Sequence, residues 1–200
     1  MSEIQQLEVP YKSQTDNALS PFSACNVTCL AMCLKYWGVE GDSSYPQLED
    51  EIFARAQQYG WNRFSPQGLK DICESYGIKD DLTISGTLTD IRDAIEDGKP
   101  VIVHGFFTEP GHLVVIKGFG ENGFLVQDPY GEIMAGLGSY SWYYQVNGGG
   151  SIFGKNLHYS NRLIAAACGG WSHGQTRDMY NELTDPDMES IENMWAHRIG

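Results

Sequence analysis

The sequence predicts an α+β fold in which helices come first and strands follow. Up to about residue 98, apolar side chains recur at the three- and four-residue spacing of amphipathic helices. From Pro100 onward, the chain changes to short runs of β-branched and aromatic residues separated by glycine-containing turns. Because the two kinds of element are grouped rather than alternating, we expect helices packed on an antiparallel sheet, not a wound parallel sheet.

Four helices are expected in the first half of the chain. The best defined follows Ser23, carries an apolar stripe that includes Leu30 and Leu34, and ends at Gly38. The third begins at the N-cap Ser65, with a proline at its first helical position. The expected bounds of the four helices are 24–38, 46–59, 65–76 and 89–98.

Three strands are expected next, in the runs PVIVHGFF, GHLVVIKGFG and GFLVQDPYG, at residues 100–107, 111–120 and 123–131. The last third of the chain is less regular. The runs SYSWYYQV (139–146) and RLIAAA (162–167) are candidates for further strands. The segment 176–199 has the pattern of one or two acidic, exposed helices.

One domain spanning 1–200 is the expected organisation, because this length suffices for one sizeable core. Within it we expect a helical half over 9–98, a β half over 99–168 and an acidic helical tail over 169–200. No apolar run approaches the roughly 20 residues of a membrane span. The N-terminal MSEIQQLEVPYKSQ lacks the basic start and apolar stretch of a secretory signal. We therefore expect a protein that is cytoplasmic as synthesised, for which any export needs another route.

The formal net charge is −13, and the lysines and arginines do not cluster. Phosphate binding requires such clusters, so nucleic acid is not an expected partner. An acidic surface can favour cationic substrates, but it more often serves solubility. The sequence leaves the oligomeric state open.

The chain has five cysteines, an odd number, and without a secretory signal they are expected to be reduced. Cys25, Cys29 and Cys33 share one helical face. At 1.5 Å per residue they spread over ~12 Å, too far to converge on one metal ion. Cys29 and Cys33 are therefore expected to be small buried residues, and no metal or other cofactor is expected.

Cys25 differs from the other thiols because it lies in the first turn of the best-defined helix. The N–H groups of a first turn have no partner within the helix, and with the helix dipole they favour negative charge. A cysteine is nucleophilic only as a thiolate, so this position favours a reactive thiol. On this feature alone, an inert buried cysteine is the commoner case.

A base and a carboxylate follow in the predicted hairpin GHLVVIKGFGENGFLVQDPYG. If its turn is centred on Gly120, His112 lies directly opposite Asp128, with Cβ atoms roughly 5 Å apart. A carboxylate beside an imidazole fixes the tautomer and stabilises the imidazolium, as in a nucleophile–base–orienter triad. A turn histidine and an Asp-Pro turn are the alternatives. A shift of the turn by one residue would separate the pair.

The remaining polar candidates carry less information. His104 is expected in a strand as a core or ladder residue, and His158 and His197 have no thiol or carboxylate pattern nearby. His173, in GGWSHG, is the reserve candidate for a base. Gln14 lies in an irregular segment before the cysteine-bearing helix and can donate its side-chain N–H to an oxyanion. From the residues alone, a surface glutamine is the simpler interpretation.

Taken together, these segments resemble the papain-like cysteine peptidase superfamily, and most closely its C39-like peptidase family. The motifs are VPYKSQ, SACNVTCLAMCLKYWG, GHLVVIKGFG and FLVQDPYG, within residues 9–131. The resemblance implies a papain-like fold, with an N-terminal helical half packed on a C-terminal antiparallel β-sheet. It also implies a thiol protease with a catalytic triad, in which Cys25 is the nucleophile, His112 the base and Asp128 the orienter, with Gln14 as oxyanion donor.

One departure from the family pattern follows the nucleophile. The family often has Cys-Gly-Pro, whereas this chain has Cys-Asn-Val at 25–27, with Thr28 and Met32 retained. The larger side chains are expected to narrow the cleft or change specificity while leaving the triad intact. Residues from about 139 onward match no part of the pattern.

The expected activity is hydrolysis of a peptide-like amide bond by a Cys-His-Asp triad through an acyl-enzyme. A peptide is the expected substrate, and the cross-link of peptidoglycan, as cleaved by lytic endopeptidases, is the second. Two other classes stay open. One is acyl transfer of the transglutaminase or phytochelatin-synthase type. The other is a non-catalytic binding module, against which the presence of all four candidate residues speaks.

Overall fold

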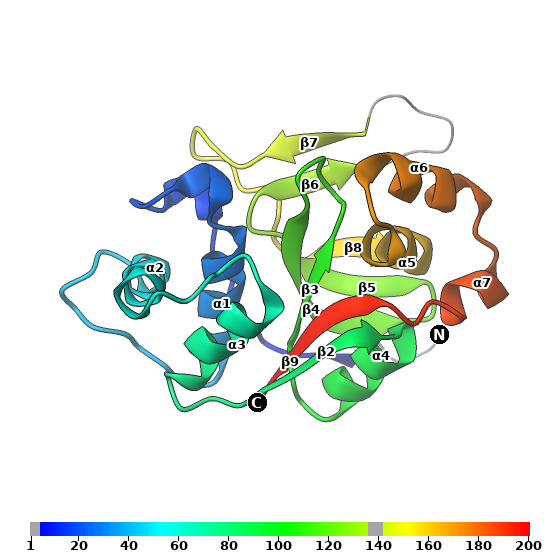
Figure 1. Ribbon diagram of the computed structural model, residues 1–200. Helices are drawn as coiled ribbons and strands as arrows, with labels where there is room; N and C mark the ends of the chain where they lie inside the picture. The colour runs from blue at the N-terminus through cyan, green and yellow to red at the C-terminus, as the bar shows by residue number, and fades with distance from the viewer. Residues whose placement is uncertain (1–4, 136–141) are drawn as a thin grey trace.

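Three helices form one side of the molecule: α1 (Cys25–Tyr36), α2 (Leu48–Tyr59) and α3 (Pro66–Glu74). In this computed structural model, which describes residues 5–135 and 142–200, they stand together to the left of the sheet in Figure 1. Two short 3-10 turns, η1 (Gln14–Asp16) and η2 (Pro21–Ser23), lead into α1. Residues 26–34 of α1 are all buried, as in a helix that runs through a core.

The predicted helices are confirmed, with ends that shift by a few residues. Ser65 caps α3 as expected, since its Oγ accepts a hydrogen bond from Gly68 N at 3.1 Å. The fourth helix, α4 (Leu88–Glu96), begins at a capping box. There the side chains of Thr87 and Asp90 each accept a hydrogen bond from the other's backbone N–H.

An antiparallel sheet forms the other half of the molecule. Its strands are β1 (Gln5–Gln6), β2 (Asp80–Gly86), β3 (Val101–Gly105), β4 (His112–Gly120), β5 (Gly123–Gln127), β8 (Leu157–Ser160) and β9 (Met194–Ile199). They pair in the order β2-β9-β3-β4-β5-β8, and β1 also pairs with β4. A separate pair, β6 (Gly131–Met134) and β7 (Tyr143–Val146), lies above the sheet in Figure 1.

The predicted α+β fold is confirmed. α1 packs against α2, α3 and β4, so the helical half lies on the antiparallel sheet as the papain-like resemblance implies. The three strands expected between residues 100 and 131 are present as β3, β4 and β5. Of the further strand candidate 139–146, the part 143–146 is β7, and residues 139–141 lie outside the described residues.

The run RLIAAA, a strand candidate, is instead part of helix α5 (Asn161–Gly169). Ser160 caps this helix, because its Oγ accepts a hydrogen bond from Leu163 N at 3.1 Å. Alanine, which fills 165–167, has the highest helix propensity. The periodicity of a short apolar run does not distinguish a buried helix from a buried strand. Here the N-cap Ser160 favours the helix.

The predicted helical tail is correct only in part. Helices α6 (His173–Glu182) and α7 (Asp185–Glu189) are present, but 194–199 forms β9, which lies between β2 and β3. The buried side chains of Met194, Ala196 and Ile199 attach it to the core. The sequence does not predict β2 either, because aspartate and glycine are poor strand formers.

Among the described residues, the hydrophobic core continues from the helices into the sheet. Leu30 and Met32 of α1, Ile102 of β3 and Phe124 of β5 are all fully buried in it. Because a core is densely packed, this contact fixes where the N-terminus of α1 lies relative to β4. In the described part of the chain, no helix is long and apolar enough to cross a membrane.

Candidate active site

The thiol of Cys25 lies at the start of α1 and faces β4. Ala24 is the N-cap and makes no side-chain hydrogen bond to the first turn. The backbone groups of Asn26 and Leu113 lie near the sulfur and help to lower the pKa of this thiol. The side chain is partly exposed, so a substrate can reach it.

His112 is the first residue of β4 and is 3% exposed. The turn before it requires glycine, because Gly111 has a φ of +89° and a Cβ there would lie 2.6 Å from His104 Nε2. The imidazole of His112 interacts directly with the Cys25 thiol. Its Nε2 is 2.8 Å from Asp128 Oδ1, so Nδ1 is the nitrogen left for the thiol.

Asp128 is fully buried and accepts hydrogen bonds on both carboxylate oxygens. The donors are His112 Nε2 (2.8 Å), Tyr130 N (2.9 Å) and Gly131 N (3.4 Å) on Oδ1, and the hydroxyls of Tyr144 (3.1 Å) and Tyr159 (2.8 Å) on Oδ2. Donors to a carboxylate stabilise its charged form. They also hold it in one orientation toward the imidazole.

The turn of the β4–β5 hairpin is not where the sequence predicts it. Gly120 pairs with Gly123, so the turn is centred beyond Gly120. His112 and Asp128 are therefore not directly opposite each other, and that predicted register is wrong. Continued without interruption, the observed register would put Asp128 on the other face of the hairpin from His112.

A β-bulge in β4 returns Asp128 to the same face of the hairpin as His112. The register shifts by one residue at Lys117, after which Val115 pairs with Gln127. Continuing this register puts Asp128 diagonal to His112 on the same face. The extra residue thus directs the carboxylate toward the ring, at the observed 2.8 Å.

The charges of the three groups depend on one another. Burial alone would raise the pKa of the Cys25 thiol, but the hydrogen bond and positive charge of His112, with the two backbone groups nearby, lower it below its usual 9.0. Burial alone would lower the pKa of His112, but the charge and hydrogen bond of Asp128 and the contact with Cys25 raise it to about 10. Both shifts favour a thiolate–imidazolium pair.

The other four thiols have the opposite character. Burial raises the pKa of Cys29 and of Cys33 well above the usual value, and it also raises the pKa of Cys73 and of Cys168. All four side chains are buried, which confirms the prediction for Cys29 and Cys33. Cys25 is therefore the cysteine whose surroundings favour the nucleophilic form.

Gln14 lies in η1 and is buried, so the surface interpretation is wrong. Its backbone N–H donates to Pro129 O at 2.8 Å, and its Nε2 donates to Pro21 O at 2.9 Å. Its Oε1 has no hydrogen-bond partner in the protein. The side chain lines the same cleft as Cys25, and its Nε2 carries a second hydrogen.

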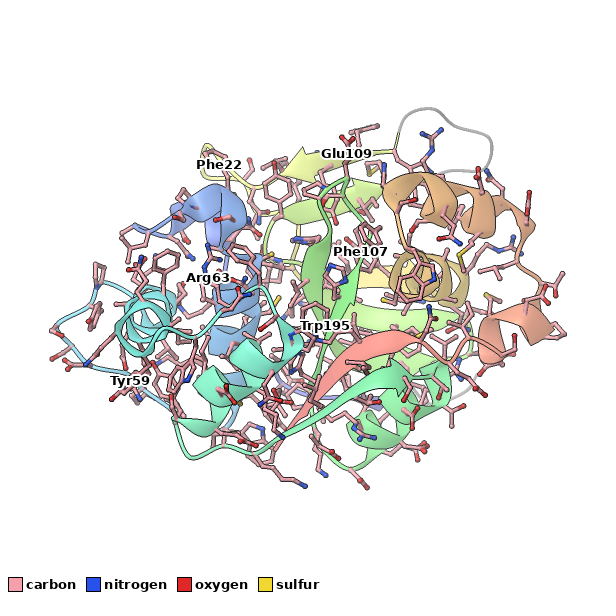
Figure 2. The ribbon with its side chains drawn as sticks, in the orientation of Figure 1. Phe22, Tyr59, Arg63, Phe107, Glu109 and Trp195 are labelled. Carbon is pink, nitrogen blue, oxygen red and sulfur yellow. The ribbon has the colours of Figure 1, made fainter. Side chains whose placement is uncertain are left out.

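A cleft of about 400 Å³ opens over Cys25 and His112, between the helical half and the sheet. Phe22 lines it from the helical side and Trp195 from the sheet side, and both are labelled in Figure 2. A larger hollow of about 660 Å³ lies beside α4, α5 and α7, and the described residues that line it include no cysteine or histidine. The smaller cleft is therefore the one that brings the candidate residues together.

Asn26 stands where the family often has glycine, and its buried side chain connects α1 to Arg63. Its Nδ2 donates to Arg63 O at 2.9 Å, and its Oδ1 accepts from Arg63 Nη1 at 2.8 Å. Arg63 also donates to the carbonyl of Ser23 and, at 2.9 Å, to its Oγ. These contacts fasten the residues on both sides of Cys25 to the loop that precedes α3.

The histidines outside the pair have varied positions. His104, expected in a core or ladder, lies in β3 but lines the cleft. His173, the reserve candidate, begins α6 and does not line the cleft. His197 has a carboxylate partner that the sequence does not predict, since its Nδ1 is 2.6 Å from Asp80 Oδ2. Among the described residues, no group of three or more His, Cys, Asp or Glu is arranged to hold a metal ion.

Sequence reasoning misses three aromatic side chains of this region. Tyr144 of β7 and Tyr159 of β8 donate to Asp128, and Trp195 of β9 lines the cleft. They come from segments without a motif. Of the three, only Tyr144 lies in a run with a strand pattern, 139–146, and many core strands share that pattern.

Among the comparisons with known proteins, a match to a family model shows the family of this chain. A model of the Peptidase_C39 like family matches residues 6–152. No curated protein matches the chain. A solved structure from Bacillus anthracis, described as a C39-like peptidase, is 19% identical with a TM-score of 0.48, and the match covers 64% of this chain and 83% of that one. The family match ends before β8, α5 and β9.

Proposed function

The chain belongs to the Peptidase_C39 like family, and on this basis we propose that it is a cysteine peptidase that hydrolyses a peptide-like amide bond through an acyl-enzyme on Cys25. One observation carries the proposal. The Cys25 thiol, at the N-terminus of α1, contacts an imidazole whose other nitrogen is 2.8 Å from the buried carboxylate of Asp128. A nucleophile, a base and an orienting group in this relation are the working parts of thiol catalysis.

In the first half-reaction, the thiolate of Cys25 attacks the carbonyl carbon and forms a C–S bond. The carbonyl oxygen becomes an oxyanion, which the Cys25 N–H and the free Nε2 hydrogen of Gln14 stabilise. His112 Nδ1 then gives its proton to the leaving amine while the C–N bond breaks. The products of this stage are a thioester on Cys25 and a neutral imidazole.

In the second half-reaction, neutral His112 removes a proton from water, and the resulting hydroxide attacks the thioester carbonyl. The C–S bond breaks, the acid leaves, and the thiolate–imidazolium pair is restored. Asp128 keeps its hydrogen bond to Nε2 throughout, so the same nitrogen of the ring faces the sulfur in both stages.

Labelling with a thiol-directed peptide electrophile tests the nucleophile. We expect the adduct on Cys25 alone, because burial raises the pKa of the other four thiols. His112→Ala should slow labelling and peptide hydrolysis by about 10³-fold, since it removes the partner that stabilises the thiolate. Peptide mapping by mass spectrometry locates the adduct, and His173→Ala, a histidine outside the cleft, is the matched control.

Equal labelling of Cys73 or Cys168 in the folded protein would contradict the assignment. So would labelling of Cys25 that is unaffected by His112→Ala. A non-catalytic binding module predicts neither rapid labelling nor product formation. Acyl transfer shares the first half-reaction, so product analysis with a competing amine separates it from hydrolysis.

A further inference from the structure

Trp195 is placed in the cleft by β9, the strand that lies beyond the family match. In the β3–β9 pairing Val103 lies opposite Ala196, so the next position sets Trp195 opposite His104. The two rings stack, with centroids 4.8 Å apart and planes at 21°. Both line the cleft, and Figure 2 shows Trp195 between β9 and the helical half.

Two fully buried side chains fix the orientation of the indole. Trp195 Nε1–H donates to His197 Nε2, and His197 Nδ1 is 2.6 Å from Asp80 Oδ2. An indole nitrogen is only a donor, so His197 Nε2 must be the acceptor and Nδ1 carries the proton given to Asp80. A chain of hydrogen bonds in a dry interior holds its last member in one position. Trp195 is thus a rigid wall of the cleft.

Two phenylalanines line the cleft from the helical side. Phe22 is 82% exposed and Phe64 is 61% exposed, although aromatic side chains usually bury most of their surface. The guanidinium of Arg63 lies 4.1 Å from the centroid of the Phe64 ring and steadies it. Exposed apolar rings beside a nucleophile are a surface that a substrate can cover.

The walls of this cleft carry little charge. As far as the structure describes them, they include no Asp, Glu, Lys or Arg. Burial, and then the charge of His112, lower the pKa of His104 to about 4, so His104 is neutral at neutral pH. The charge of His112 is already engaged by Cys25 and Asp128. A charged substrate side chain would lose its hydration here and find no partner.

We propose that Trp195 and His104, with Phe64 and Phe22 opposite them, form a specificity site for an uncharged aromatic side chain of the substrate peptide, next to the scissile bond. The inference rests on the proposed function and names its substrate class. A flat ring can stack on Trp195 and cover the exposed phenylalanines at the same time. Peptidoglycan cross-links, whose side chains are small or charged, match this surface poorly.

Asp80 and His197 are positioning residues in this proposal, because they act on the substrate only through Trp195. His197→Gln keeps a hydrogen-bond acceptor for the indole, whereas His197→Leu does not. The ratio of kcat/KM between an aromatic and an alanine peptide should therefore be retained better in His197→Gln than in His197→Leu. A purely structural role would lower activity on both peptides alike.

The direct test uses peptides that are identical except at one position flanking the cleaved amide. We expect Phe and Tyr to exceed Ala by about 10- to 100-fold in kcat/KM at one such position, with Lys and Glu the poorest. Trp195→Ala should reduce this preference to about threefold or less, and Trp195→Phe should keep most of it. Phe64→Ala, which removes an exposed ring and leaves the core intact, should lower the same preference.

Trp171→Ala is the matched control, since Trp171 is 75% exposed and does not line the cleft. Its activity and preference should equal those of the unmodified protein. Equal kcat/KM for the Phe and Ala peptides would overturn the proposal. So would a preference that survives in both Trp195→Ala and Phe64→Ala, or faster cleavage of charged cross-link peptides.

Failure of the specificity site and failure of the proposed function give different results. Iodoacetamide has no side chain to recognise, so its rate of reaction with Cys25 reports the nucleophile alone. Labelling of Cys25 without an aromatic preference overturns only the specificity site. If no peptide is hydrolysed, titration calorimetry on the Cys25→Ala variant can measure the binding affinity of each peptide in the same set. Equal affinities for the Phe and Ala peptides would contradict the specificity site.

Discussion

At the scale of single residues, Asp128 determines the electrostatics of the cleft. It is fully buried, and its charge and hydrogen bond are the largest of the interactions that raise the pKa of His112 to about 10 against the burial that lowers it. The folded pKa of His112 thus lies above its usual 6.5. Its imidazolium therefore contributes stability that is complete below pH 6.5 and is lost as the pH rises through about 10.

Asp128→Asn should narrow the pH profile of kcat/KM from both sides. The alkaline limb, set by the imidazolium, should move down from about 10 toward 6.5, because the main cause that raises the pKa of His112 is removed. The acid limb should move up, since a weaker positive charge lowers the pKa of Cys25 less. We expect the maximum of kcat/KM to fall about 100-fold.

The measurement is the pH dependence of peptide hydrolysis and of Cys25 alkylation. Asp187→Asn, which changes an exposed aspartate in the cap of α7, should leave both limbs in place. An alkaline limb that does not move in Asp128→Asn would show that another group sets it.

The residues of the site differ in how visible they are in the sequence. Cys25, His112 and Asp128 could be found because each stands at a recognisable place, a helix start or the ends of a hairpin. The structure brings the three together, and their catalytic roles stay predictions. Tyr159 and Trp195 could not be found, because the sheet pairing that brings them near the site joins segments far apart in the chain.

At the scale of elements, the N-terminus of α1 depends on the loop before α3. Arg63 spans the two, with hydrogen bonds to Ser23 on one side of Cys25 and Asn26 on the other. A planar guanidinium can serve several acceptors at once, and an ammonium group on a lysine cannot reproduce that geometry. The start of the helix is thus held by a side chain outside the helix.

Arg63→Lys should lower the free energy of unfolding by about 2 kcal/mol, because charged hydrogen bonds to Ser23 and Asn26 are lost. It should also slow the alkylation of Cys25, whose helix turn is no longer held. Urea denaturation and the rate of iodoacetamide labelling measure the two effects. Arg55→Lys is the matched control, since Arg55 lies 4.1 Å from the Tyr76 ring centroid but bonds only residues remote from the cleft. Similar losses in both variants would contradict a specific role for Arg63.

Helices and strands could be predicted where a cap or a change of periodicity marks them in the sequence, and not where such a mark is missing. Ser65 with a following proline marks the start of α3, and the change of periodicity at Pro100 marks the first of the three central strands. The bulge at Lys117 has no such signal, yet it decides which face Asp128 occupies. The hairpin could therefore be predicted from the sequence, whereas its register could not.

At the scale of the whole molecule, the sheet is completed by β9, the strand that comes last in the sequence. β9 pairs with β2 on one side and with β3 on the other, so it joins the strand after α3 to β3, the neighbour of the strand that begins at His112. The sequence prediction of an exposed helical end misses this, because MWAHRI is too short for its periodicity to decide. The interior of a sheet needs long-range pairing that no local pattern encodes.

Removal of residues 190–200 should abolish cooperative unfolding, because β2 and β3 would each expose an unpaired edge next to the core. Thermal unfolding followed by circular dichroism measures this. A synthetic peptide of residues 190–200 added to the shortened chain should restore the transition, and a scrambled peptide should not. A shortened chain that still unfolds cooperatively and labels at Cys25 would contradict the central role of β9.

The position of β9 has a consequence for the timing of synthesis. A ribosome makes α1 early and β9 late, so the nascent chain carries its cysteine long before the sheet can close around it. Until β9 emerges, the sheet lacks the strand between β2 and β3, and the cleft lacks Trp195. The proposed peptidase activity therefore requires that translation has passed the last strand, so the topology itself would delay its onset.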